Sequence, residues 1–119
     1  MGNRMSVTIY HNPRCSKSRK TLELLQSRGI KPVIIEYLKD PPTRIKLNEI
    51  LAMLKLEPRQ LMRTNENVFK EKGLDDPSLS KGQLVNAMVE NPVLIERPIV
   101  IANGKAVIGR PPEKVLKII

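Results

Sequence analysis

The chain contains a single cysteine and a single histidine, and they stand four positions apart, at His11 and Cys15. The thiolate is the nucleophilic form of cysteine, and a free thiol with a pKa of about 8.5 is mostly protonated at neutral pH. Cys15 is flanked by the cationic residues Arg14 and Lys17, and Ser18 follows with a hydroxyl group. Cations and hydrogen-bond donors stabilise a thiolate. The residue types and their spacing therefore predict a reactive thiolate at Cys15.

Cys15 and His11 could each have another role. An isolated cysteine is often a small buried packing residue, but Cys15 stands among polar and charged residues and not in an apolar run. We therefore favour a nucleophile at Cys15. His11 either caps loop backbone groups or tunes the thiol, and the sequence leaves both roles open. One cysteine and one histidine cannot form a zinc site, and no bound cofactor is predicted.

The sequence Cys15-Ser16-Lys17-Ser18 carries serine where a Cys-x-x-Cys redox motif would have its second thiol. The chain cannot form an internal disulfide, so an adduct on Cys15 must be released by an external thiol. The cysteine count thus predicts a glutathione-type or dithiol partner.

The elements around Cys15 follow from local patterns. A β-branched run predicts a strand at Val7–Tyr10, helix formers predict a helix from Ser16 to about Arg28, and Val33–Leu38 is typical of a second strand. Cys15 would then stand at a helix N-terminus, where unpaired N–H groups and the helix dipole favour a thiolate or an oxyanion.

Further along the chain, three helices are expected: one capped by Thr43, a short one from Pro58, and one opened by the capping box at Ser80. The stretch 64–77 stays unassigned. Apolar runs around Asn103-Gly104 predict a hairpin, and a final helix is expected through Ile119. The order β-α-β, helical insert, β-β-α predicts an α/β protein with a thioredoxin-like fold and a mixed four-stranded sheet.

Composition limits the function classes. The 119 residues, 40% hydrophobic and 28% charged, suit one soluble domain at 7–119 after an N-terminal tail at 1–6. The tail's match to a myristoylation pattern at Gly2 is too loose to use. The net charge of +9 favours anionic partners, whereas 3% aromatic residues disfavour nucleic-acid binding by base stacking. With no apolar run long enough for a membrane span or a signal, a cytoplasmic location without membrane association is expected.

Three segments together resemble one family. They are His11-Asn12-Pro13-Arg14-Cys15-Ser16-Lys17-Ser18-Arg19, Glu96-Arg97-Pro98-Ile99-Val100 and Gly109-Arg110-Pro111-Pro112-Glu113. From Val7 to Ile119 the chain resembles the glutaredoxin-dependent ArsC family of arsenate reductases, and especially the small ArsC-like proteins of the YfgD type.

The resemblance implies that Cys15 attacks arsenate and forms a thiol-arsenate adduct, which glutathione and glutaredoxin then reduce to arsenite. It implies that Arg63, Arg97 and Arg110 surround the oxyanion, and that the peptide bond before Pro98 is cis. Arginine suits this role because its planar fork donates two hydrogen bonds to an oxyanion. His11 and Ser18 complete the predicted catalytic group.

Two alternatives stay open. The chain could be a glutathione-dependent thiol oxidoreductase that acts on another substrate. It could also be a non-catalytic regulator like the Spx-type proteins, which share the fold but typically carry a Cys-x-x-Cys pair.

Overall fold

The computed structural model describes residues 6–119, so the predicted tail, apart from Ser6, and the pattern at Gly2 lie outside the described residues. The chain divides into two compact units. The sheet unit contains the described residues before Pro41 together with Arg97–Ile119, and the helical unit contains Pro41–Glu96.

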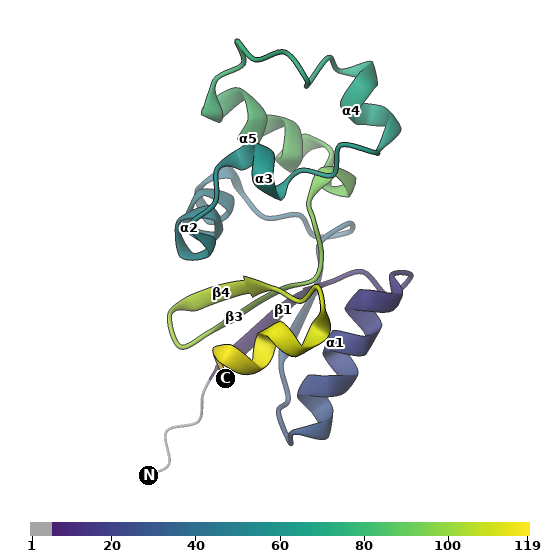
Figure 1. The fold of residues 1–119 in the computed structure, drawn as a ribbon, viewed down its shortest axis with the longest axis vertical. Helices are drawn as coiled ribbons and strands as arrows, with labels where there is room; N and C mark the ends of the chain where they lie inside the picture. The colour runs from purple at the N-terminus through teal and green to yellow at the C-terminus, as the bar shows by residue number, and fades with distance from the viewer. Residues whose placement is uncertain (1–5) are drawn as a thin grey trace. The chain divides into compact units, whose positions relative to one another are not determined.

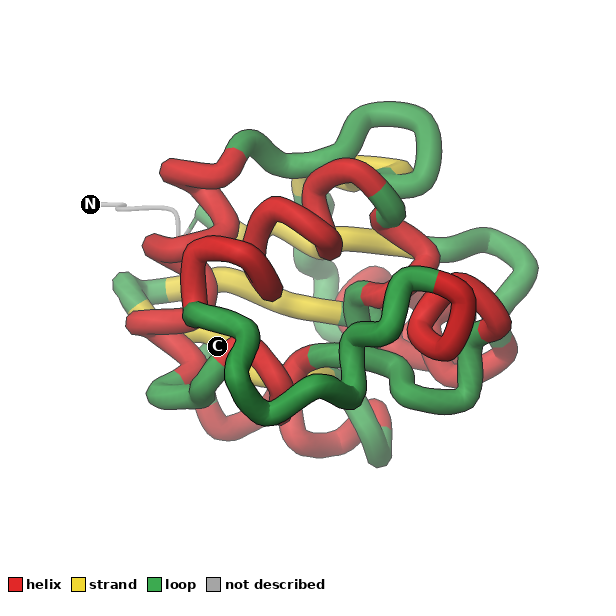
Figure 2. The backbone as a smooth tube through the Cα atoms, turned by 90° about the horizontal axis from the view of Figure 1, so that it is seen from above, coloured by secondary structure: helices red, strands yellow, loops and turns green. Residues whose placement is uncertain are grey.

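The sheet unit contains all four strands of the described chain. Figure 1 labels β1, β3, β4 and α1 of this unit, and Figure 2 colours the strands yellow and the helices red. Its elements are β1 (Val7–His11), α1 (Ser16–Ser27), β2 (Val33–Glu36), β3 (Ile99–Ala102), β4 (Lys105–Ile108) and the 3-10 helix η2 (Pro112–Lys117). The strand order is β2-β1-β3-β4, with β1 and β2 parallel and the other pairs antiparallel. The mixed four-stranded sheet and the α/β class are as predicted.

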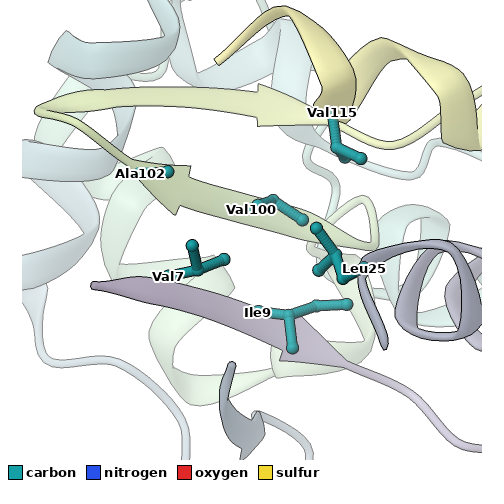
Figure 3. Close-up of a cluster of buried hydrophobic side chains, with 6 residues drawn as sticks. All are labelled: Val7, Ile9, Leu25, Val100, Ala102 and Val115. Atoms are coloured by element: carbon teal, nitrogen blue, oxygen red, sulfur yellow. The ribbon is translucent and has the colours of Figure 1, made fainter. Parts of the chain in front are cut away.

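The core of the sheet unit lies between the sheet and two helices. Alternate residues of a strand point to the same face. Val7 and Ile9 of β1 therefore join Val100 of β3 in one buried cluster, with Leu25 of α1 and Val115 of η2 packed against them (Figure 3). This packing fixes α1, and with it Cys15, on one face of the sheet.

The β3–β4 hairpin turns at Asn103 and Gly104, which both have positive φ angles, of 55° and 71°. Asparagine and glycine tolerate this backbone region best, which explains the turn that the sequence predicted. The register pairs Ile99, the first residue of β3, with Ile108, the last residue of β4. The segment before β3 and the segment after β4 therefore lie next to each other where they meet the hairpin.

The helical unit confirms the predicted helical insert. It contains α2 (Arg44–Leu54), α3 (Pro58–Leu61), α4 (Asn67–Glu71), α5 (Lys81–Glu90) and the 3-10 helix η1 (Pro92–Leu94). Thr43 caps α2 by accepting a hydrogen bond from the Lys46 N–H, and Ser80 and Gln83 form the predicted capping box of α5. The unassigned stretch contains the short helix α4.

Three predicted boundaries were wrong. β1 ends at His11 and not at Tyr10, because His11 still pairs with Glu36 of β2. β2 ends at Glu36 and not at Leu38, because the Lys39 and Asp40 N–H groups both bond to the Glu36 carbonyl in a turn. The final helix is a 3-10 helix that ends at Lys117. Its i→i+3 bonds close short turns, which are common near proline-bearing ends. Among the helices of residues 6–119, none is both long enough and apolar enough to cross a bilayer.

Candidate active site

Cys15 is the N-cap residue of α1, as predicted from the pattern around it. Its backbone is extended, its N–H donates to the Asn12 carbonyl at 3.0 Å, and its carbonyl accepts from the Arg19 N–H at 3.0 Å. The Asn12 side chain also accepts from the Arg14 N–H. The loop therefore presents the partly buried sulfur at the open end of the helix.

The sulfur lies in a cationic environment. Burial by itself raises the pKa of the Cys15 thiol. The opposing effects are together larger and lower the pKa: they are hydrogen bonding to the Ser18 N–H, the hydrogen bond and charge of Arg97, and hydrogen bonding to the Lys17 N–H. The net result is a lowered pKa. The Arg110 Nη1 atom also donates to Sγ at 3.9 Å. Each of these contacts favours the thiolate over the thiol.

Arg97 and Arg110 reach the sulfur because they flank the β3–β4 hairpin. Arg97 precedes β3 and Arg110 follows β4, and the Arg110 Nη1 atom donates to the Arg97 carbonyl at 3.2 Å. The Arg97–Pro98 peptide bond is cis, as expected, and the Arg110–Pro111 bond is cis as well. The hairpin thus brings two guanidinium groups from positions distant in sequence to one thiol.

Gly109 holds the second of these segments against α1. Its N–H donates to the Pro98 carbonyl at 2.9 Å, and its carbonyl accepts from Thr21 Oγ1 at 3.3 Å. A Cβ atom at position 109 would lie 2.7 Å from Thr21 Oγ1 and 3.0 Å from Pro98 Cγ. Only glycine permits this close approach of the segment that carries Arg110.

His11 and Ser18 form a buried pair behind the cysteine loop. The His11 Nδ1 and Ser18 Oγ atoms lie 2.6 Å apart, and the same Oγ accepts from the Asn12 N–H at 3.0 Å. Burial lowers the pKa of His11. The negative charge of Glu36 raises this pKa in part, and the positive charge of Arg19 lowers it. His11 is therefore linked through Ser18 to the first turn of α1, and the Ser18 N–H helps to lower the pKa of the Cys15 thiol.

Arg63, the remaining predicted ligand, belongs to the helical unit and is paired with two carboxylates. Its Nη1 atom lies 2.6 Å from Glu96 Oε1, and its Nε atom lies 3.1 Å from Glu66 Oε2. Burial by itself lowers the pKa of the Arg63 guanidinium. The two glutamates raise the pKa by more than burial lowers it, so the guanidinium keeps its positive charge. The pairing of Arg63 with these two glutamates was not predicted.

No group of three or more metal-ligating side chains occurs within residues 6–119. The site that the residues above form places a cysteine with a lowered pKa beside two arginines, and its thiolate can attack an electrophilic centre bearing anionic oxygens.

Comparison with known proteins decides the family. The family profile described as ArsC family matches residues 10–118. The chain belongs to the ArsC family. It is 54% identical to the uncharacterized protein YfgD of Escherichia coli K12, and the match covers 95% of this chain and 96% of YfgD. It is 50% identical to a Haemophilus influenzae protein named arsenate reductase, over 97% of this chain and all of that protein.

A solved structure titled arsenate reductase, from Vibrio cholerae, matches this ArsC chain with a TM-score of 0.96 at 52% identity. The match covers 98% of this chain and 100% of that one. The thioredoxin-like architecture of the ArsC family is therefore that of this protein.

Some residues that shape the ArsC site were missed from the sequence. Thr21 and Gly109 lie 88 positions apart, and only their contact shows that they fix the Arg110 segment. Glu66 and Glu96 were not predicted to take part in the site. A signal existed for Glu96 and Gly109, because each begins one of the three segments that resemble the family.

Proposed function

We propose that this ArsC protein is an arsenate reductase that uses Cys15 as its nucleophile. The observations that carry the proposal are the place of Cys15 at the N-terminus of α1, the hydrogen bond of 3.9 Å that Arg110 Nη1 donates to Sγ, and the lowered pKa to which Arg97 and the Ser18 and Lys17 N–H groups contribute. The names of the relatives at 47–50% identity support the choice of arsenate. The proposal places the reaction in the cytoplasm, where thiols are kept reduced.

In the first step the Cys15 thiolate attacks the arsenic atom of arsenate. A sulfur–arsenic bond forms, and one arsenate oxygen leaves as water after taking up protons. Arsenic stays pentavalent in this step. Arg97 and Arg110 would stabilise the negative charge on the remaining oxygens, because guanidinium groups donate two parallel hydrogen bonds to such anions.

Reduction follows with two external thiols. Glutathione displaces a second oxygen as water and forms its own sulfur–arsenic bond. A glutaredoxin thiolate then attacks the glutathione sulfur, so that the two thiols leave as a mixed disulfide and arsenic gains two electrons. Water releases arsenite from Cys15 and restores the thiol. The need for external thiols rests on the lack of a second cysteine.

His11 and Ser18 would serve this chemistry as positioning residues. Their hydrogen bond holds the first turn of α1, whose N–H groups lower the pKa of the Cys15 thiol. The resemblance also assigns Arg63 to the oxyanion, and its charge, retained beside Glu66 and Glu96, is compatible with that role.

The test is arsenite formation from arsenate with glutathione and glutaredoxin. We expect turnover by the native protein and none by Cys15→Ser. A substitution at exposed Lys31, Lys31→Ala, should leave the rate unchanged. If the native protein gives no more arsenite than Cys15→Ser, arsenate is not its substrate.

The same proteins separate the alternatives. A thiol oxidoreductase would reduce a mixed disulfide of glutathione with a Cys15-dependent rate while leaving arsenate unchanged. A regulator of the Spx type would retain a protein partner after Cys15→Ser and would show no turnover with either substrate.

A further inference from the structure

A groove runs along one side of α1, on the sheet unit. Its volume is about 530 Å³. One wall comes from α1 and the other from the segment that follows β4, and the lining residues are Lys17, Lys20, Glu23, Leu24, Ser27, Pro111, Pro112 and Glu113. No step derived above uses the side chains of this groove.

Both walls lead to the reactive sulfur. The α1 wall begins at Lys17, which lies in the first turn of α1, two residues after Cys15. The opposite wall begins at Pro111, directly after Arg110, whose Nη1 atom lies 3.9 Å from Sγ. A small molecule lying in the groove would therefore have one part next to the thiolate.

The groove carries charges of both signs. Lys17 and Lys20 stand on α1 nearest the sulfur, and Glu23 and Glu113 provide negative charge farther along α1 and on the opposite wall. All four side chains are exposed, and none takes part in the ion pairs found within residues 6–119. Leu24 and the two prolines supply apolar surface between them. The charges are available for a ligand that bears both carboxylate and ammonium groups.

We infer that this groove binds glutathione without a covalent bond and presents its thiol to the adduct on Cys15. The inference rests on the proposed function, which needs an external thiol at that place. Glutathione has two carboxylates, one ammonium group, a thiol in its middle residue and uncharged amides. The carboxylates complement Lys17 and Lys20, and the ammonium group complements Glu23 or Glu113.

The dimensions agree with this ligand. From Lys17 to Ser27 the helix rises about 15 Å, and an extended tripeptide is about 10 Å long. A volume of about 530 Å³ falls in the range of small-molecule sites, whereas a protein partner needs about 800 Å² of surface on each side. A simple oxyanion would meet the repulsion of Glu23 and Glu113.

The experiment uses S-methylglutathione, which keeps all three charges but cannot react. Adding it to the full-length ¹⁵N-labelled protein should shift the backbone amides of Lys20, Glu23, Leu24 and Glu113 in a saturable way. The diethyl ester of the same compound, which lacks both carboxylate charges, should shift them little. Equal shifts from both compounds, or no shifts at these amides, would overturn the inference.

Substitutions test the charges. Lys20→Glu should weaken S-methylglutathione binding about tenfold, as expected for the loss of one charge-assisted contact. Glu113→Lys, on the opposite wall, should also weaken it. Lys31→Glu makes the same charge change at an exposed residue outside the groove and should leave the dissociation constant unchanged. Unchanged binding by both groove variants would refute the inference.

The outcome is separable from that of the proposed function. Saturable binding in the groove without arsenite formation would remove arsenate as the substrate and support the glutathione site. Arsenite formation with an unchanged KM for glutathione in Lys20→Glu and Glu113→Lys would support the enzyme and overturn the site. Amide shifts caused by glutaredoxin alone, and not by S-methylglutathione, would assign the groove to a protein partner and overturn the inference.

Discussion

The contact between Gly109 and α1 predicts a sharp effect of one added methyl group. In Gly109→Ala the new Cβ atom would lie 2.7 Å from Thr21 Oγ1, 3.0 Å from Thr21 Cγ2 and 3.0 Å from Pro98 Cγ. Thr21 is fully buried and its hydroxyl donates to the Lys17 carbonyl at 2.8 Å. The side chain therefore has no free space into which it could turn, and the segment carrying Arg110 must move.

The magnitude follows from two opposing effects. Overpacking a well-packed site costs about 1–3 kcal/mol. Replacing glycine by alanine lowers the entropy of the unfolded chain, which stabilises the folded protein by about 0.4–1 kcal/mol. We expect a net loss of about 1–2 kcal/mol in the free energy of unfolding. With an m value of about 2 kcal/mol/M, the urea midpoint should fall by about 0.5–1 M.

Urea unfolding of three matched variants checks this reasoning. Gly82→Ala adds a methyl group in α5 where the nearest atom, Ser80 Oγ, is 3.9 Å away, and it should stabilise the protein by about 0.5–1 kcal/mol. Thr21→Ala removes two of the three close atoms, Oγ1 and Cγ2, and leaves Pro98 Cγ, so the double variant with Gly109→Ala should lose less stability than the two single losses added together. A Gly109→Ala protein as stable as the native one, or strictly additive losses, would refute the account of this contact.

Three further predictions concern local interactions. Ser80→Ala removes the capping box of α5 and should lower the free energy of unfolding in urea by about 1 kcal/mol. An unchanged free energy of unfolding would show that the cap does not stabilise the protein. Ser18→Ala leaves the buried His11 ring and the Asn12 N–H without their shared partner and should cost about 1–3 kcal/mol; a neutral result would show that the pair contributes nothing. The ring protons of His11 should titrate below pH 6.5 in NMR spectra, because burial lowers its pKa. The unfolded chain then binds this proton more readily than the folded one, so stability should fall as the pH drops below about 6.5, and a His11→Gln variant should lose this dependence.

The parts of the fold that the sequence predicted are those specified by neighbouring residues. The hairpin at Asn103-Gly104 follows from two residues that accept positive φ, and the start of α5 follows from Ser80 and Gln83. The place of Cys15 follows in the same way from a strand, a proline-bearing turn and a helix. These features depend on a few adjacent residues, so periodicity and capping suffice to find them.

The remaining features depend on contacts between distant segments. The end of β2 at Glu36 and the 3-10 form of η2 depend on turn hydrogen bonds that no apolar pattern marks. The pairing of Arg63 with Glu96 joins residues 33 positions apart. The roles of Arg97 and Arg110 at the site were predicted from the family resemblance alone. In a chain with many basic residues, the sequence does not otherwise distinguish a site arginine from a surface arginine.

The central claim is that the surroundings of Cys15 favour the thiolate, and the pH dependence of its alkylation by iodoacetamide measures this directly. Cys15 is the only thiol, so the reaction reports a single site. In the folded protein the alkylation rate should reach half of its maximum at a pH below about 8.5, and the same chain unfolded in urea should return to about that value. A folded-state midpoint at or above that of the unfolded chain would contradict the account.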